Sequence, residues 1–436
     1  MRPPRDTTLT LLFGAALGLR LLVVFLEPAS RPLGDEPSWL AVADAVTAAG
    51  FHPLRLNGMF YPPLYPYMIA AVHGFFGTLT AVKIVQCLVG ALLVPVVASV
   101  GARAYGRATG LAAAAMAALS PVSAWYAAHF WAEPLFVLLL WVGIERVLAG
   151  DESDRLAPTI AGGAALGLAA LAREPALYFV PVAALWLAAR RDRRSLPRAG
   201  ALLASALLVT GLWTIRNYVC YGALVPVSTM GGRALWEGNT GRTRGEVYAE
   251  YDEVGAEQGM VAQHRFAIAE ALREIRARQP GWIFEKIASE IPHLLSPDNM
   301  VLTQVRRRAY GPVSRLEIWL VTIVTILPYI VLLGFFVLGL ARLVPSRARV
   351  LLLAFLLFYV ALHVLVHGHH RFRLPMLPAM YAIAASALPA AGAALAPFTP
   401  RRRALAAVLA ILLAATLVPG FVGIASEPAF RRGPAR

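Results

Sequence analysis

Eleven long apolar runs are the feature of this sequence that most restricts its fold. A membrane-spanning helix needs about 20 predominantly apolar residues, and most of the runs approach that length. Hydrophobic residues make up 58% of the 436 residues and charged residues only 15%; soluble proteins average roughly half and a quarter. The sequence therefore predicts an all-α polytopic membrane protein and excludes a soluble enzyme. The runs cover residues 8–26, 79–101, 108–124, 131–149, 157–172, 175–189, 199–215, 318–341, 350–366, 374–396 and 404–424.

The basic residues predict an orientation for these spans. The net charge is +15, and its arginines are scattered between the apolar runs rather than placed on one amphipathic face, which argues against a nucleic-acid partner. Cytoplasmic loops carry an excess of Lys and Arg. If the short stretch 67–77 lies in the interface without crossing, a cytoplasmic N-terminus puts all the arginine-rich loops inside. We therefore expect eleven spans in the cell (inner or plasma) membrane, with the C-terminus outside.

This topology divides the chain into three parts. Residues 1–215 form an N-terminal membrane module with a first external loop at 27–78, residues 216–317 form a small external α-rich segment, and residues 318–436 return to the membrane. Within the external segment we expect helices at 262–278 and 282–295, whereas the Gly- and Thr-rich stretch 231–245 is typical of a loop. The glycine pairs Gly14/Gly18 and Gly163/Gly167 allow close helix packing.

Ionisable residues gather at the outer ends of the expected spans. Such residues are costly in a membrane, so their placement indicates function. Asp35 has two compatible interpretations: it is the N-cap of a short interfacial helix in which Glu36 and Pro37 form the first turn, or it is a general base at the start of that helix. Carboxylates and cations on one face would suit an anionic lipid headgroup.

Several short motifs, taken in order, resemble the GT-C type polyprenyl-phosphate-dependent glycosyltransferases, whose members include protein O-mannosyltransferases and lipid A aminoarabinose transferases. The resemblance runs from Thr8 to about Pro378. It rests on Gly34-Asp35-Glu36-Pro37, Tyr61-Pro62-Pro63-Leu64-Tyr65-Pro66, Leu119-Ser120-Pro121, Glu133-Pro134-Leu135-Phe136, Leu171-Ala172-Arg173-Glu174-Pro175 and Arg371-Phe372-Arg373-Leu374-Pro375.

The resemblance implies a GT-C-like fold with interfacial helices in the first external loop, and it implies site roles. Asp35 would be the catalytic base, with Glu36 supporting it or contacting the acceptor, and Glu133 would be a second acidic residue of the site. The donor phosphate would be bound by Arg173, Arg371, Arg373 and His370. Glu174, directly after Arg173, could neutralise that arginine. Candidate acceptor or sugar contacts are Tyr61, Lys83, Trp236 and Asn239, although Trp236 fits a turn with a buried indole slightly better.

The expected reaction transfers a sugar from a polyprenyl-phosphate donor to an acceptor hydroxyl on the outer face, with inversion. Arginine suits the leaving phosphate because guanidinium offers paired donors and keeps its proton. We expect no additional cofactor, and the acceptor could be a protein, a lipid or a polysaccharide. The histidines His363, His367, His369 and His370 invite a metal site, but they lack a zincin pattern and adjoin Arg371 and Arg373, so no metal is expected.

Two other functions remain open from sequence. An O-antigen ligase or polymerase also has many spans and a large external loop with arginines, but it would not be expected to need Asp35-Glu36. A lipid-linked sugar flippase or transporter would perform no chemistry. It predicts ionisable residues and broken helices near the bilayer centre.

Overall fold

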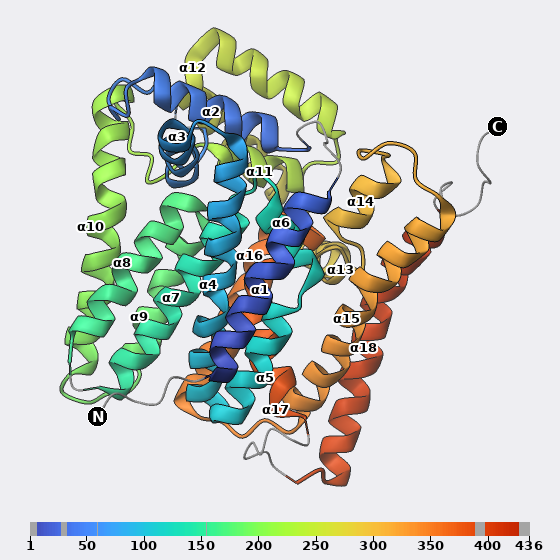
Figure 1. The fold of residues 1–436 in the computed structure, drawn as a ribbon. Helices are drawn as coiled ribbons and strands as arrows, with labels where there is room; N and C mark the ends of the chain where they lie inside the picture. The colour runs from blue at the N-terminus through green and yellow to red at the C-terminus, as the bar shows by residue number, and fades with distance from the viewer. Residues whose placement is uncertain (1–6, 28–32, 59, 154, 389–396, 427–436) are drawn as a thin grey trace.

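The computed structural model is all-helical in the residues it describes, which are 7–27, 33–58, 60–153, 155–388 and 397–426 (Figure 1). The basic flank with Arg2 and Arg5, the end of the expected run 374–396 and the C-terminal residues 427–436 lie outside the described residues. The helices are α1 (Thr7–Leu26), α2 (Glu36–Ala48), α3 (Leu64–Phe76), α4 (Leu79–Tyr105), α5 (Arg107–Ala118), α6 (Pro121–Ala128), α7 (Glu133–Glu152), α8 (Ala157–Ala172), α9 (Pro175–Ala188), α10 (Ser195–Tyr221), α11 (Met230–Asn239), α12 (Arg244–Ala277), α13 (Trp282–Leu295), α14 (Met300–Arg306), α15 (Arg315–Ala341), α16 (Arg347–Leu365), the 3-10 helix η1 (His370–Met376), α17 (Leu377–Ser386) and α18 (Pro400–Ser426).

Six of the described helices are long and apolar enough to cross a membrane, and a seventh span results if the bent pair α5 and α6 counts as one. The six are α1, α4, α10, α15, α16 and α18. Large apolar side chains stay exposed on their outward faces, for example Leu208 on α10, Leu320 on α15 and Ile411 on α18. Such surfaces suit lipid. The fold class is therefore a polytopic helical membrane protein, and the finer number of eleven spans stays a prediction.

The third expected span is not a straight helix. The chain bends by 54° between α5 and α6, where Ser120 accepts a hydrogen bond from the backbone N–H of Ser123 as the N-cap and Pro121 occupies the first turn. Proline favours a helix start and disfavours the helical conformation of the residue before it. The stretch 122–130, expected as an external connection, consequently contains most of α6, and its place outside the membrane stays a prediction.

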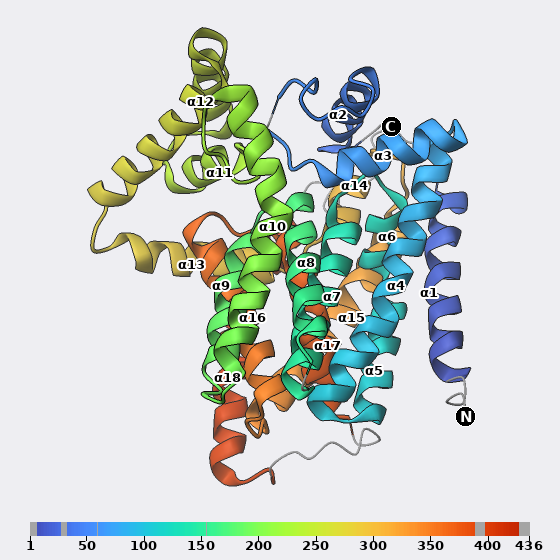
Figure 2. The same cartoon turned by 90° about the vertical axis from the view of Figure 1, so that its left-hand side faces the viewer.

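The helices outside the bundle gather at one end of it. Figures 1 and 2 show α2, α3, α11 and α12 at the same end, with α2 and α3 lying across the bundle. The first external loop is tied down by Arg216 at the end of α10, which donates to the backbone oxygens of Pro53 (2.9 Å), Leu56 and Gly58 (3.2 Å). The 13-residue α3 is too short to cross alone.

The external segment is more helical than the sequence indicates. Helix α13 has the bounds expected for it, but the glycine-rich stretch expected as a loop contains α11 and the start of α12. Thr243 and Glu246 form a capping box at the start of α12, which offsets the poor helix propensity of glycine. Our division of the chain at residues 215 and 317 stays a prediction.

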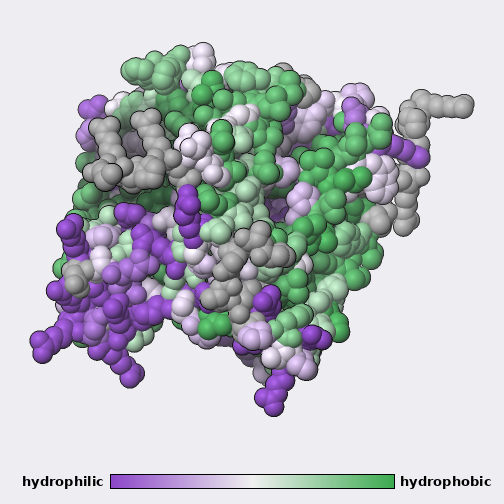
Figure 3. Space-filling view, turned by 60° about the horizontal axis from the view of Figure 1, so that its bottom comes forward, coloured by the Kyte–Doolittle hydropathy of each residue, from purple (hydrophilic) through white to green (hydrophobic). Residues whose placement is uncertain are grey.

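The arginine-rich turns lie together at the opposite end of the bundle. Figure 3, turned so that the lower end of Figure 1 comes forward, shows hydrophilic side chains concentrated at one side of that end. Ion pairs there join α4, α7, the turn before α10 and the start of α16: Arg103 with Glu145, Arg190 with Asp151 (3.3 Å) and Arg347 with Asp151 (2.8 Å). This is the arrangement that the arginine distribution predicts.

Of the two glycine pairs, one mediates close packing. A Cβ at Gly163 on α8 would lie 2.4 Å from the carbonyl oxygen of Leu202 on α10, and one at Gly167 would lie 2.9 Å from that of Ala206. Around Gly14 and Gly18, a Cβ would meet no described atom within 4 Å. The packing role is confirmed only for α8 and α10.

We predict that a cysteine on α2 and a cysteine on the arginine-rich end label from opposite sides of the membrane. In a background without the native Cys87 and Cys220, a membrane-impermeant maleimide should label the exposed Asp44→Cys in intact spheroplasts. The exposed Arg193→Cys should be labelled only after permeabilisation. Labelling of both variants in intact spheroplasts would contradict the topology.

We predict that Gly163→Ala destabilises the detergent-solubilised protein and that Gly14→Ala does not. Forcing a methyl group into close helix packing costs typically about 1–3 kcal/mol, whereas the position of Gly14 has space for it. Thermal unfolding measured on both variants should therefore give a lower Tm for Gly163→Ala alone, and equal Tm values would refute the packing assignment.

Candidate functional site

Glu133, at the start of α7, collects charged partners from distant parts of the chain. Its carboxylate is 3% exposed, and Oε1 pairs with Arg173, at the end of α8, and with Nε of Arg371 at 3.4 Å. Arg371 also donates from Nη1 to Oδ2 of Asp35 at 2.6 Å. Residues 35, 133, 173 and 371, widely separated in sequence, thus form one network of two carboxylates and two guanidiniums.

Aromatic rings fix the two guanidiniums of this network. The Arg371 guanidinium lies over the rings of Trp131 (4.9 Å) and Phe372 (5.0 Å), and that of Arg173 lies 5.4 Å from the Phe372 ring centroid. Cation–π contacts of this kind contribute about 0.5–2 kcal/mol when desolvated. The arginines are therefore held in place before any ligand arrives.

The network faces a cavity of about 450 Å³ at the end of the bundle covered by α11 and α12. Four arginines line it, Arg173, Arg233, Arg244 and Arg371, together with the carboxylates Asp35, Glu174 and Glu237. Apolar and aromatic side chains also line it, among them Leu177, Tyr178, Ile268, Leu362 and Val366. A cavity lined by both arginines and apolar side chains fits an amphiphile with an anionic headgroup.

Asp35 occupies the N-cap position of α2, but its side chain makes no capping hydrogen bond. The carboxylate turns to Arg371 instead. Burial by itself would raise the pKa of Asp35, but the charge and hydrogen bond of Arg371, helped by Arg173 and Arg244, lower it below its usual value. Asp35 is therefore ionised at neutral pH, as a general base has to be.

Glu36 and Glu174 direct their carboxylates to the backbone and to serine. Glu36 is 3% exposed and accepts from the backbone N–H groups of Leu33 (2.7 Å) and Phe130 (2.8 Å). These two bonds hold the first loop against the segment before α7.

Glu174 accepts from the N–H and hydroxyl of Ser228, so Arg173 keeps Glu133 as its partner. The concern that Glu174 neutralises Arg173 is not supported by these contacts.

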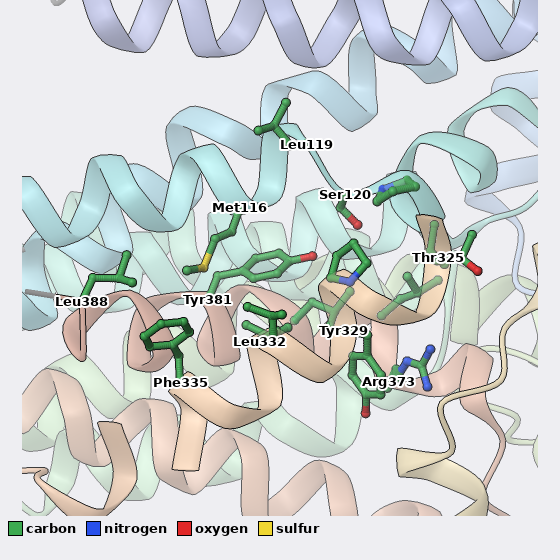
Figure 4. A pocket seen from close by; sticks show the side chains of 16 residues that line it. Met116, Leu119, Ser120, Thr325, Tyr329, Leu332, Phe335, Arg373, Tyr381 and Leu388 are labelled. Atoms are coloured by element: carbon green, nitrogen blue, oxygen red, sulfur yellow. The ribbon is translucent and has the colours of Figure 1, made fainter. Parts of the chain in front are cut away.

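Arg371 and Arg373, two residues apart, point to different places. Arg373 lines a second, mainly apolar cavity of about 340 Å³ between α5, α15 and α17 (Figure 4). It donates to the backbone oxygens of Ser296 and Asp298 (2.9 Å), and its guanidinium lies 3.9 Å from the Tyr329 ring centroid. The two arginines line different cavities, because a 3-10 turn places residues two apart on different sides, and a phosphate-binding role for Arg373 stays a prediction.

The histidines near Arg371 are neutral at physiological pH. Burial first, and then the neighbouring Arg371 and His367, lower the pKa of His369 to about 3. Burial, with His369 and Arg373, also lowers the pKa of His370 well below its usual value. His370 stacks on His369 at 4.0 Å and is absent from the cavity lining, whereas His363 and His367 line it. His370 therefore offers no positive charge for a phosphate.

The remaining sequence candidates divide into one cavity residue and three that pack elsewhere. Tyr61 lines the cavity beside Trp39. Lys83 lies 5.4 Å from the Phe130 ring centroid. Trp236 is 1% exposed and packs on Phe266, and Asn239 bonds to Leu235, Leu365 and Trp282. In the part of the chain that the structure describes, no group of three or more His, Cys, Asp or Glu side chains could hold a metal ion.

Residues of the external segment complete the cavity, and sequence reasoning missed them. Arg244 pairs with Glu237 (3.0 Å) and donates to the hydroxyl of Tyr248, and Arg233 lies over the rings of Phe60 and Tyr248. The capping box at Thr243 could have indicated a helix start at Arg244, but nothing in the sequence indicates that this helix covers Asp35.

A comparison with protein-family models gives one match. Residues 61–214 match the family model described as dolichyl-phosphate-mannose-protein mannosyltransferase, a segment that includes Tyr61, Glu133 and Arg173. No curated protein matches the sequence.

Solved structures of membrane glycosyltransferases share the fold. The chain is similar to the Archaeoglobus fulgidus oligosaccharyltransferase AglB in complex with an inhibitory peptide and a dolichol-phosphate: TM-score 0.53, 13% identity, 99% of this chain and 56% of that one. The crystal structure of the same enzyme with zinc and sulfate gives a TM-score of 0.54, 12% identity and coverage of 98% and 54%. ArnT from Cupriavidus metallidurans bound to undecaprenyl phosphate gives a TM-score of 0.53 at 15% identity, over 96% of this chain and 66% of that one.

The chain spans about half the length of the oligosaccharyltransferase that it matches. At 12–15% identity the structural likeness concerns the fold alone. The chain is thus a polytopic helical membrane protein that shares its fold with these membrane glycosyltransferases, and its residues 61–214 match the model of the dolichyl-phosphate-mannose-protein mannosyltransferase family.

Proposed function

We propose that this protein is a glycosyltransferase that moves a sugar from a polyprenyl-phosphate donor to an acceptor hydroxyl on the extracytoplasmic face. The observation that carries the proposal is the cavity in which Asp35, Arg173 and Arg371 meet, and which arginines and apolar side chains line together. The titles of two fold relatives name lipid phosphates, dolichol-phosphate for AglB and undecaprenyl phosphate for ArnT, and this chemistry fits the cavity.

In the proposed reaction, Arg371 and Arg173 bind the donor phosphate and Asp35 accepts the acceptor's proton. The acceptor oxygen attacks the anomeric carbon as the bond from that carbon to the phosphate oxygen breaks. Polyprenyl phosphate leaves with its added charge met by the two guanidiniums, and the configuration inverts. General base catalysis is worth roughly 10²- to 10⁴-fold, and charge stabilisation supplies more.

Donor binding would also strengthen the base. Before binding, Arg371 is hydrogen-bonded to Asp35 at 2.6 Å, and this contact weakens the basicity of the carboxylate. A phosphate that takes over donors of Arg371 would release Asp35 and raise its pKa. Asp35 would then accept a proton readily only when the donor is in place.

We further propose eleven spans, with α7, α8, α9 and α17 completing the seven candidates. Helix α17 has only ten residues, all of them buried, so protein rather than lipid surrounds it and its length need not match the bilayer.

The alternatives receive less support. A transporter predicts ionisable residues through the bilayer centre, whereas in the described spans most of these residues lie near the two ends, and the innermost, Arg20 on α1 and Glu145 and Arg146 on α7, are still within two turns of an end. A ligase or polymerase would not be expected to need Asp35, which in this cavity faces two arginines.

We predict that Asp35→Asn abolishes transfer while leaving undecaprenyl phosphate binding within a few-fold of the parent. The substitution keeps size but removes the base. Asp44→Asn, on the exposed side of the same helix α2, is the matched control. Detergent-purified variants would be compared in lipid binding and in single-turnover transfer from a polyprenyl-phosphate sugar. A parental transfer rate in Asp35→Asn would refute the base assignment.

We predict that Arg371→Lys and Arg373→Lys differ in donor binding. Losing a hydrogen bond to a charged group costs about 1.5–3 kcal/mol, so Arg371→Lys should weaken undecaprenyl phosphate binding roughly 10- to 150-fold. Arg373→Lys should lower the Tm through its lost backbone contacts and leave the Kd nearly unchanged. Equal losses of affinity in the two variants would contradict the assignment of the phosphate to Arg371.

A further inference from the structure

The second cavity, of about 340 Å³, lies inside the membrane part of the bundle (Figure 4). Helices α5 and α15 each pack against α17, and the cavity lies between them. The wall formed by α5 ends at the 54° bend before α6, where Leu119, Ser120 and Pro121 line the cavity. The other wall is α15, one of the helices long and apolar enough to cross a membrane.

The long axis of this cavity follows α15. Thr325, Leu332 and Phe335 all line it, and ten residues of α-helix measure about 15 Å. Figure 4 shows Thr325 and Arg373 toward one end of the cavity and Phe335 and Leu388 toward the other. Because the hydrocarbon core of a bilayer is about 30 Å thick, the cavity is about as deep as one leaflet.

The two ends of the cavity differ in polarity. Apart from Ser120, Thr325 and Arg373, the lining side chains are apolar or aromatic. Arg373 belongs to η1, which also carries Arg371, so the charged end is the end nearer the candidate site. Apolar cavities tend to stay free of water, and a void loses the dispersion contacts that a filled space would make. An apolar chain therefore suits this cavity better than water does.

The cavity is open on the side that faces lipid. Leu119 on one wall is 61% exposed, and Val331 on the other wall is 49% exposed. Val331 lies in the middle of α15, at a depth where hydrocarbon chains surround a membrane-spanning helix. A chain can thus enter from the side, between the two walls.

The polyprenyl donor is the other hydrocarbon to consider. The arginines assigned to its phosphate, Arg173 and Arg371, line the first cavity and not this one. Arg373, the cation of this cavity, donates instead to the backbone oxygens of Ser296 and Asp298. The chain of a phospholipid from the surrounding leaflet has the depth of the cavity and needs no phosphate site inside it.

We propose that one acyl chain of a membrane phospholipid occupies the second cavity, with its headgroup at the end near Arg373. The chain would pack against Leu374 and Leu377, which line the cavity directly after Arg373. It would thereby support η1, the turn that carries Arg371, from the membrane side. The site is separate from that of the proposed reaction and does not rest on it.

The test uses the full-length protein in nanodiscs that contain a phosphatidylglycerol with a diazirine in one acyl chain. After irradiation, mass spectrometry of peptides should find cross-links on Leu332 and Leu377, which line the cavity and are buried. Val331→Trp narrows the opening and should remove most of these cross-links. Val324→Trp is the matched control, because this valine of α15 is similarly exposed (53%) but does not line the cavity.

Thermal unfolding gives a second measurement. A ligand that binds only the native state stabilises it, so phosphatidylglycerol added to delipidated protein should raise the Tm of the parent and of Val324→Trp more than that of Val331→Trp. If Val331→Trp does not fold, Leu119→Trp narrows the same opening from the other wall and replaces it in both measurements.

Three results would overturn the proposal. The first is a parent protein without cross-links on Leu332 and Leu377, and the second is cross-linking that persists unchanged in the variant with the narrowed opening. The third is cross-linking of these two residues by diazirine-tagged undecaprenyl phosphate and not by the phospholipid, which would assign the cavity to the donor chain. None of these measurements uses sugar transfer, so a failure of the proposed function would leave their outcome unchanged.

Discussion

The buried carboxylate of Glu133 is the group on which the candidate site depends. It lies among apolar residues at the start of α7, where an ionised carboxylate without partners would be strongly unfavourable. Arg173 and Arg371 supply those partners, and each brings its own segment with it. Removing one member of a buried charge pair typically costs about 3–5 kcal/mol. The requirement to satisfy one acid therefore fixes the end of α8 and the turn η1 relative to α7.

Asp35 joins this arrangement from the first external loop through Arg371. The loop is held by contacts that have no direct part in chemistry: Arg216 takes three of its backbone oxygens, and Glu36 binds the N–H groups of Leu33 and Phe130. In the proposed reaction, positioning by such contacts matters because the base acts on the acceptor hydroxyl and the arginines act on the donor phosphate, and the two must be held close together. The acid next to Asp35 thus has a supporting role through the backbone.

The helical membrane fold expected from the sequence is confirmed, and the departures from other expectations have identifiable physical causes. The motifs containing Asp35, Glu133, Arg173 and Arg371 meet in one network of ion pairs, and their roles stay predictions. Arg373 does not join them, because two residues along a 3-10 turn change the direction of the side chain. Trp236 is buried, as the slightly preferred interpretation expected, rather than placed as an acceptor or sugar contact. The prediction of a loop over residues 231–245 was wrong, because tertiary contacts and a capping box outweighed the low helix propensity of glycine.

The sequence alone determined that this protein lies in a membrane and which charged residues lie at each end of its helix bundle. Apolar runs of this length are stable in a bilayer as helices, because a helix satisfies its own backbone N–H and C=O groups where no water is present. Successive spans then place the arginine-rich turns and the residues of the candidate site at opposite ends of the bundle. The tertiary structure decided which charges pair. A buried charge is stabilised by whichever opposite charge lies within a few ångströms, and a distance such as the 2.6 Å between Arg371 and Asp35, across 336 residues, depends on how all the helices between them pack.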